Sequence, residues 1–439
     1  MRGLPVCLLW GVLLLCLCAR ASSDSLGLID GFLAAQMDYY TAAGPRVMAT
    51  FSSTMPPSGA LQCFDSATGM NYTSIYGYPL SEAADMYDNA LAAMYFLERG
   101  SLSRAQAICD AFVLLERRGV PGVCPQGGCT VAAVMANDTA FTTAPGPQNA
   151  QVSVGNLMWQ AMALQRCGAY VSSRKADYLA SAEHIADWVI ANRRSDTGGF
   201  VLNAGSGVAS TEHNIDATAL FRNLHASTGN ATYLAAQQHA GQFVGRMWNN
   251  GFFVAGSLED GSINTQLPVP LDAQAWADLA AVNVPAQNVK QAIAWALTNM
   301  LVNTTNTCPG AESFFGSSFS QCSHSMKADG TCGVQNEETA SLALALLLNA
   351  DHAAEAEGDA LLASLQAQQL SAPIGAACTR PPAKGPANGI VATPVPRGVN
   401  AGFYYCYPNA YHVASTAWTG LALLAKTGSK TANPFVSCE

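Results

Sequence analysis

Glu212 and Asp216, two acidic residues one helical turn apart, are the strongest candidates for chemistry in this sequence. They follow Ser210 and Thr211, which are residue types that cap helix N-termini, so both carboxyl groups are predicted on one face of a helix near its start. The positive end of a helix favours ionised acids, whereas a second carboxylate opposes full ionisation of both. Such a pair can be divided into one proton donor and one ionised group. The alternative is a purely structural role as first-turn capping acids.

Polar residues recur at the starts of five further predicted helices. They are Asp85 with Asp88, Asn156 with Gln160, Asp272 with Gln274, Glu337 with Glu338, and His412. Aromatic residues accompany them, namely Tyr87, Trp159, Trp276, Tyr411 and Trp418. Polar groups between aromatic platforms are typical of a site for an uncharged sugar chain, if these helix starts share one mouth. Core packing is the alternative role for each aromatic residue taken singly.

Twelve predicted helices must position these residues. Their predicted ranges are 26–43, 81–97, 102–118, 152–167, 174–192, a helix from 210, 233–248, a helix from 271, a helix ending near 301, 336–349, 353–370 and 411–426. The loop before each helix that opens with polar residues is long, and nearly every other connection is short. This alternation predicts an all-α fold, an (α/α)6 barrel of six helical hairpins with long loops at one rim, where all inner helices begin. Functional residues usually lie on such loops.

The N-terminus predicts export from the cell. Arg2, an apolar run and the small-residue sequence 19–21 indicate a signal peptide over residues 1–21, which leaves a single toroid domain over 22–439. Removing Arg2 and Arg20 reduces the 21 basic residues to 19 against 30 acidic ones, a net charge of −11. This charge disfavours nucleic acid as a partner, and no later segment predicts stable membrane insertion. We therefore expect a secreted monomer.

The cysteines also indicate an oxidising compartment. Fourteen cysteines less the three in the predicted signal peptide leave eleven. Most fall in predicted loops, with Cys109 and Cys167 on helices, so we expect disulfides that hold long loops and one remaining thiol. Zinc is the alternative for Cys124 and Cys129, but no matching Cys/His pair follows at ligand spacing. No metal or cofactor is predicted. Glycosylation sequons at Asn71, Asn137, Asn230 and Asn303 suit a secreted glycoprotein.

The sequence resembles the six-hairpin glycosidase superfamily and, within it, an exported bacterial-type group of poorly defined substrate. The resemblance rests on residues 87–91, 155–159, 210–216, 271–276, 337–340 and 416–418, together with 433–435. It extends from about residue 80 to 436 and implies an (α/α)6 toroid that acts on carbohydrate. Cysteine-containing insertions at 119–151 and 303–334 depart from the pattern, which leaves the shape of the cleft and the substrate open.

Glycoside hydrolysis needs one protonated carboxyl group over the glycosidic oxygen and a second, ionised one. Glu212 is our candidate for the general acid. Asp88 is the first candidate for its partner, followed by Asp272 and Glu337, because groups on different inner helices can face each other across the cavity. Asp216 shares the helix of Glu212 and is expected to orient it or to bind a hydroxyl group. An inverting reaction on a neutral poly- or oligosaccharide is the expected outcome.

The remaining candidates bind substrate. They are Asp272, Glu337, Asn156, Trp159, Trp276, His213 and His412. An alternative function is a sugar epimerase or isomerase that uses histidine bases such as His213 and His412, although a neutral histidine also suits a packed inner rim. A polysaccharide lyase is disfavoured because the helix starts offer almost no Arg or Lys. A third alternative is a non-catalytic carbohydrate-binding or cell-wall toroid, since a fold does not determine a function.

Overall fold

The computed structural model describes residues 24–40, 43–52, 63–65, 70–72, 74–75, 78–141, 152–203, 206–305, 312–322, 332–349, 352–372, 388–396, 398–402 and 406–437. The predicted signal peptide over residues 1–21 lies outside these ranges. Within them, twelve α-helices make up most of the structure, as expected for an all-α fold.

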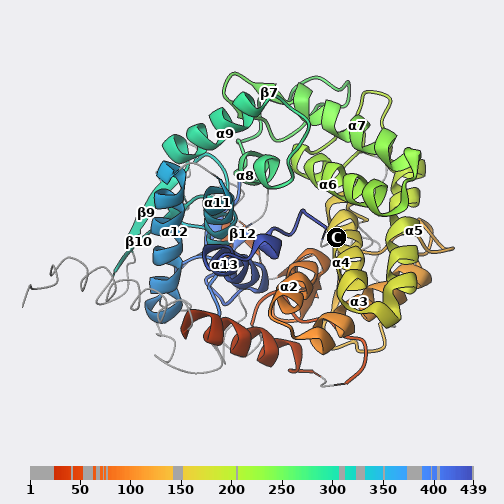
Figure 1. Cartoon of the computed structure of the whole chain (residues 1–439). Coiled ribbons are helices and arrows are strands. Elements are labelled where there is room, and N and C mark those ends of the chain that lie inside the picture. The colour runs from red at the N-terminus through yellow and green to blue at the C-terminus, as the bar shows by residue number, and fades with distance from the viewer. Residues whose placement is uncertain are drawn as a thin grey trace, which may run out of the picture.

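Six of these helices form a closed inner ring. In ring order they are α2 (Met86–Glu98), α4 (Val154–Tyr170), α6 (Thr211–Thr228), α8 (Asp272–Leu279), α11 (Asn336–Leu348) and α13 (Val413–Lys426), and α13 contacts α2 to complete the circle. The outer layer comprises a helix over residues 24–37, α3 (Leu102–Arg118), α5 (Lys175–Arg193), α7 (Ala231–Arg246), α9 (Ala286–Asn299) and α12 (His352–Ser371). This arrangement, visible in Figure 1, confirms the predicted (α/α)6 barrel.

The inner helices are buried around most of their circumference. In α13 every side chain from Val413 to Leu424 is buried, and in α11 every side chain from Asn336 to Leu346. Such helices have no solvent face to carry charges, because outer helices cover one side and ring neighbours cover the others. The low content of charged residues, 12%, follows from this double-layered packing.

The rim loops contain six small antiparallel hairpins or strand pairs. They are β1 (Cys63–Asp65) with β2 (Met70–Tyr72), β3 (Ser74–Ile75) with β4 (Tyr78–Pro79), β5 (Ala83–Asp85) with β6 (Ala133–Met135), β7 (Trp248–Asn249) with β8 (Phe252–Phe253), β9 (Leu301–Thr305) with β10 (Ser313–Ser317), and β11 (Val399–Asn400) with β12 (Cys406–Tyr407). The β5–β6 pair corrects one predicted boundary. The helix expected from residue 81 begins at Met86, because pairing with β6 holds 83–85 extended and Asp85 caps the helix by accepting a hydrogen bond from Tyr87 N at 2.8 Å.

In the first two turns of each inner helix, a polar side chain donates a hydrogen bond to the carbonyl four residues earlier, at or just before the helix start. We call these the anchor residues: Asn89, Gln160, Asn214, Gln274, Thr339 and Thr416, with donor–acceptor distances of 2.6–3.1 Å. The pattern is an internal sixfold repeat. It identifies equivalent positions on all six inner helices, although the residue type changes from amide to hydroxyl around the ring.

The anchor residues also attach the rim loops to the inner helices. Asn214 accepts from Phe200 N at 2.8 Å and donates to Phe200 O at 3.1 Å, and Gln274 forms the same pair with Phe253 at 2.8 Å each. Gln160 bonds Thr130 instead. The polar openings of these helices are therefore partly structural: Gln160 and Gln274, expected at the mouth of a sugar site, hold loops and do not line the cavity described below.

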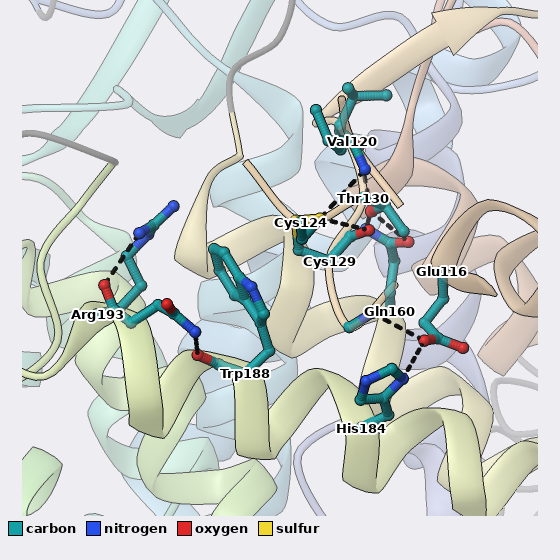
Figure 2. Close-up of a disulfide and its surroundings, with 12 residues drawn as sticks. Glu116, Val120, Cys124, Cys129, Thr130, Gln160, His184, Trp188 and Arg193 are labelled. Atoms are coloured by element: carbon teal, nitrogen blue, oxygen red, sulfur yellow. Dashed lines mark hydrogen bonds and ion pairs between the residues drawn. A yellow bond between two sulfur atoms is a disulfide. The ribbon is translucent and has the colours of Figure 1, made fainter. Parts of the chain in front are cut away.

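A disulfide between Cys124 and Cys129 closes the loop that follows α3 (Figure 2). The bond excludes the alternative of a zinc site at these two residues. Buried Glu116 accepts hydrogen bonds from Gly128 N at Oε1 and from Ser181 Oγ at Oε2, each at 2.9 Å. His184 Nδ1 lies 2.6 Å from Glu116 Oε1. The loop then continues into β6, so these bonds support the strand pair that leads into α2.

Two further disulfides lie within the described residues. Cys322 bonds Cys332 in a rim loop, and Cys109 on α3 bonds Cys167 on α4. The expectation that disulfides hold loops is thus correct for two of these three, whereas the third joins an outer helix to an inner one. Cys406 of β12 is disulfide-bonded as well. No described helix has the length and apolar character needed to cross a membrane.

The segment after α13 closes the ring at the end opposite to the long loops. It crosses the inside of the ring towards α4 in Figure 1. Asn433 donates to Leu279 O at 2.8 Å, while Arg222 and Asn223 donate to Phe435 O at 2.7 and 3.1 Å. Phe435 is fully buried. In the described part of the chain, this segment therefore fills the end of the barrel opposite to the rim where the inner helices begin.

Candidate active site

A cavity of about 320 Å³ lies at the N-terminal ends of the inner helices. Six acidic residues line it, and we call them the carboxyl ring: Asp85, Asp88, Glu212, Asp272, Glu337 and Glu338. They come from the starts of α2, α6, α8 and α11, because the shared direction of the inner helices brings their first turns to one rim. The volume is near the lower end of the range for ligand pockets, about 300–1,000 Å³.

Nine of the ten residues that the sequence singles out line this cavity. They are Asp88, Asn156, Trp159, Glu212, His213, Asp272, Trp276, Glu337 and His412. The exception is Asp216, which is fully buried one helical turn below Glu212. The structure therefore brings together residues that are up to 324 positions apart in the chain, from Asp88 to His412.

Glu212 is the most accessible member of the carboxyl ring, since its side chain is partly exposed and the other five are buried. Ser210 caps its helix by accepting a hydrogen bond from His213 N at 3.4 Å, as the sequence predicts. Removal from bulk water, and then the charges of Asp272, Asp216 and Glu337, raise the pKa of Glu212 well above its usual value. The raised pKa favours the protonated form of Glu212, whose side chain lines the cavity.

Asp216 is fully buried next to the indole of Trp159, one helical turn beyond Glu212. Neither of its carboxyl oxygens has a hydrogen-bond partner of good geometry, although the indole of Trp159 is directed at it. Burial and the charge of Asp272 raise the pKa of Asp216 well above its usual value, and the Trp159 indole only partly opposes this. The raised pKa favours the protonated form of Asp216, which can influence Glu212 without lining the cavity.

Asp88 and His412 form a contact between α2 and the start of α13. His412 Nε2 lies 3.6 Å from Asp88 Oδ1, while Asp88 Oδ2 has no hydrogen-bond partner. Burial disfavours a charge on the imidazole, but Asp88 and then Glu337 outweigh it and raise the pKa of His412. The raised pKa favours a positive charge on His412 beside this part of the ring.

Asp272 and Glu337 complete the centre of the carboxyl ring. Burial raises the pKa of Asp272 to about 7, opposed by the backbone N–H of Ala273 and supported by the charge of Glu337. Glu337 accepts a hydrogen bond from the Tyr87 hydroxyl, which in turn accepts one from Trp418 Nε1 at 2.7 Å. Around neutral pH, Asp272 can exchange a proton with its surroundings.

Asp85 and Glu338 also line the cavity, although they are not among the site residues proposed from sequence. Asp85 Oδ1 accepts from Asn156 Nδ2 at 2.8 Å as well as from the start of α2, so Asn156 holds a neighbouring acid in place. Glu338 is buried, and its Oε2 has no hydrogen-bond partner. Its position next to Glu337 in a first helical turn is the sequence signal that could have identified it.

The floor of the cavity is aromatic. Trp159 and Trp276 line it with their ring centroids 5.4 Å apart, and both rest on Phe435, at 5.0 and 5.7 Å. Trp418 and Tyr411 do not line it. Trp418 is fully buried beside this cluster, and Tyr411 packs against Phe32 of the outer layer at 5.5 Å. From the sequence, core packing is the alternative role of each aromatic residue, and this alternative is correct for Trp418 and Tyr411.

His213 closes one side of the cavity as a neutral ring. Burial lowers its pKa to about 4, and its Nδ1 has no hydrogen-bond partner. Gly155 makes room for it, because a Cβ atom at that position would lie 2.5 Å from His213 Cδ2. Helix α4 can therefore approach α6 closely only with a glycine here.

Several lining residues come from rim loops and carry no sequence signal of a site. They are Thr50, Ser153, Leu202, Asn203, Phe319 and Tyr407. Their position next to the cavity depends on the conformation of the long rim loops. None of the described residues that line the cavity is a lysine or an arginine.

Comparison with known proteins supports the fold. No protein-family model matches the sequence, and no curated protein sequence matches it significantly. Among solved structures, a glycosidase in complex with glucose is similar at 10% identity and a TM-score of 0.60, covering 93% of this chain and 98% of the other. An unsaturated glucuronyl hydrolase from Bacillus sp. GL1, described as degrading glycosaminoglycan, matches at 12% identity and a TM-score of 0.57, with 96% and 99% covered.

A D-mannose isomerase is also similar, at 11% identity and a TM-score of 0.57, with 91% of this chain and 97% of the other covered. Hydrolases and an isomerase of sugars thus share this architecture. At these identities the likeness establishes the fold and leaves the reaction to be inferred from the site. The chain has the (α/α)6 toroid fold of the six-hairpin glycosidases, which the motifs in its sequence predict.

Proposed function

We propose that this chain is a secreted glycoside hydrolase with Glu212 as the general acid. Its proposed substrate is a poly- or oligosaccharide without acidic groups, a class that includes the neutral glycans. The observation that carries the proposal is the state of Glu212: it reaches the cavity and its pKa is raised well above the usual value by burial and by neighbouring carboxylates. A protonated carboxyl group in this position can protonate the oxygen of a glycosidic bond.

Asp88 is the proposed general base. Its Oδ2 has no hydrogen-bond partner and can take a proton from a water molecule, while His412 holds Oδ1. Asp272 and Glu337 remain the next candidates, and Asp216 is assigned to the orientation of Glu212 because it does not reach the cavity. Asn156, Trp159 and Trp276 are assigned to binding sugar hydroxyls and ring faces.

The order of helices supports an inverting reaction. Glu212 on α6 and Asp88 on α2 are separated in the ring by α4, and packed helices lie about 8–10 Å apart. Two carboxyl groups that extend inward from non-adjacent helices leave room for a water molecule, as the separation of roughly 6.5–9.5 Å in inverting enzymes requires. A covalent glycosyl intermediate needs a shorter separation, about 5–5.5 Å.

An isomerase or epimerase is the second candidate. It is favoured by two histidines in the cavity wall, one of which, His213, stays neutral and has a free Nδ1. A neutral imidazole can accept a proton from a sugar carbon or hydroxyl group. This reaction would tolerate amidation of Glu212 better than loss of His213.

Release of reducing sugar from a panel of glycans by the mature protein tests the proposal. Glu212→Gln should abolish release while the circular dichroism spectrum stays unchanged, and Glu259→Gln, at an exposed glutamate of a rim loop, serves as the matched control. Loss of activity in His213→Gln but not in Glu212→Gln would favour the isomerase. Binding of glycans by both proteins without any turnover would identify a carbohydrate-binding toroid and contradict the hydrolase.

A further inference from the structure

The cavity has many more acidic groups than hydrolysis requires. Two carboxyl groups suffice for an inverting or retaining glycosidase, whereas six line this cavity and Asp216 lies directly beneath. Asp85 has a structural explanation, since it caps α2 and binds Asn156. With Glu212 and Asp88 assigned to catalysis, Asp272, Glu337 and Glu338 remain on one side of the cavity, from the adjacent helices α8 and α11.

His412 faces Asp88 and Glu337, and among the described lining residues it is the side chain whose pKa shift favours a positive charge, so Asp272 and Glu338 lack a fixed cation of their own. These described residues include no lysine or arginine, and His213 is neutral. Desolvation of several carboxyl groups in one enclosed space is costly unless a positive charge or hydrogen-bond donors compensate for it. The compensating charge must therefore come from the ligand or from bound protons.

Two unpaired oxygens point to a ligand with strong donors. Glu338 Oε2 and Asp88 Oδ2 belong to side chains that are 1% and 2% exposed, and neither oxygen has a hydrogen-bond partner. Buried acceptors without donors are rare in folded proteins, and each costs about 1–3 kcal/mol or more when charged. A sugar carboxylate offers acceptors and a like charge, so it would worsen both problems.

Building on the proposed hydrolase function, we propose that the sugar bound in this cavity carries a free amino group in its protonated form. A compact ammonium has three N–H donors and one positive charge, which suit the Asp272, Glu337 and Glu338 side of the carboxyl ring. The aromatic floor of Trp159 and Trp276 would contact the apolar face of the same ring. The substrate class is therefore an oligosaccharide of amino sugars, and an N-acetyl group would remove the charge that the site selects.

Binding of such a sugar should release protons. Burial and mutual repulsion raise the pKa of Glu338 well above its usual value, and that of Asp272 to about 7. An entering ammonium favours the ionised carboxylates and lowers these pKa values, so protons leave as the ligand binds. The titratable groups that face this region are the carboxyl ring, Tyr87 from α2, Asp216 and His213 from α6, Tyr407 from β12, and His412 before α13. The residues of α4 that line the cavity are uncharged. Affinity should rise with pH until the amine itself loses its proton.

Isothermal titration calorimetry with glucosamine, N-acetylglucosamine and glucose tests this proposal on the mature protein. Measurements from pH 5.5 to 7.5, each in two buffers of different ionisation enthalpy, give the number of protons released. We expect glucosamine to bind at least about tenfold more tightly than glucose, equivalent to about 1.4 kcal/mol, with net proton release and an affinity that increases with pH. Equal affinities, or binding of glucosamine without proton release, would overturn the proposal.

Glu338→Gln separates the role of charge from that of shape. This variant should lose most of the preference for glucosamine over glucose, while its affinity for glucose changes little and its thermal unfolding shows an intact fold. If it fails to fold, Asp272→Asn provides the same comparison on the adjacent helix. Retention of the full preference in both folded variants would contradict the proposed ammonium site.

Hydrolysis assays distinguish this proposal from the function on which it builds. Oligomers of glucosamine, of N-acetylglucosamine and of glucose are compared as substrates. Cleavage of neutral oligomers in preference to glucosamine oligomers would support a hydrolase and overturn the amino-sugar specificity. Tight, proton-coupled binding of glucosamine without cleavage of any oligomer would support the ammonium site and contradict the hydrolase.

Discussion

His412 Nε2 lies 3.6 Å from Asp88 Oδ1 across the seam where α13 meets α2. His412 Nδ1 lies 2.8 Å from Ser415 Oγ and 3.4 Å from Ser415 N, and these contacts direct Nε2 towards Asp88. The capping contact that begins α13 therefore also sets the direction of the imidazole. Helix capping and positioning of the candidate base depend on the same side chain.

The first prediction concerns this pair. On a glycan that the protein cleaves, Asp88→Asn should lower kcat by ~10²–10⁴-fold, the usual contribution of a positioned base. His412→Gln should have a smaller effect on kcat and should shift the pH dependence of kcat/KM, because the cationic neighbour is gone. Asp260→Asn, at an exposed rim residue, is the control. Full activity of Asp88→Asn would transfer the role of base to Asp272 or Glu337.

A second prediction follows from the raised pKa of Asp272, about 7 in the folded protein. Because the folded state binds this proton more tightly than the unfolded state, the stabilisation is present at low pH and is lost as pH rises through 7. The loss is at most on the order of 4 kcal/mol, at 1.36 kcal/mol per pKa unit. Urea unfolding at pH 5.5 and 8 should show Asp272→Asn gaining stability relative to the wild type at pH 8. An unchanged difference between the two pH values would contradict the assigned pKa.

The third prediction concerns the closed end of the barrel. Phe435→Ala should reduce the free energy of unfolding by about 3–5 kcal/mol, as expected for a buried phenylalanine. It should also lower activity, because Trp159 and Trp276 lose the ring on which they rest. Phe435→Leu is the matched variant and should retain more of both. Denaturant unfolding measures the stability, and sugar release measures the activity. A destabilised but fully active Phe435→Ala would show that Phe435 does not position Trp159 and Trp276.

A fourth prediction tests the anchor residues. Asn214→Ala leaves both Phe200 N and Phe200 O without their side-chain partner, and each unsatisfied buried group costs about 1–3 kcal/mol. Asn192→Ala on α5 is the control, since this exposed asparagine bonds only within its own helix. Thermal unfolding should rank Asn214→Ala well below the control. Equal melting temperatures would show that water replaces the anchor without loss.

Local patterns in the sequence predict most helices well. The range 102–118 agrees with α3 at both ends, because its apolar period and its flanking Gly100 and Gly119 are local signals. The start of α2 is misplaced by five residues, since the pairing of β5 with β6 joins segments about 50 residues apart. The first helix ends at residue 37 instead of 43. Local periodicity carries no information about such long-range contacts.

For the candidate site as well, local features could be predicted from the sequence and features that depend on long-range contacts could not. Glu212, Asp272 and Glu337 could be grouped from sequence because each occupies the first turn of an inner helix, and the ring brings these turns together. Asp216 lies one helical turn further from the rim and is fully buried. Its acidic side chain suggested a contact with the substrate, but the surrounding side chains keep it out of the cavity. Loop residues such as Phe319 could not be predicted, because their position depends on the course of the long rim loops.

The position of Phe435 in the chain determines when the interior of the barrel can be completed during synthesis. Phe435 completes the floor, yet it is made after every helix of the ring, and the contact of Phe32 with Tyr411 joins the two ends of the chain. A nascent chain therefore has an unfinished interior until Phe435 has emerged from the ribosome or from an export channel. Contacts of such high sequence separation also fold slowly. In an exported chain, the floor of the cavity is completed only after every helix of the ring has been translocated.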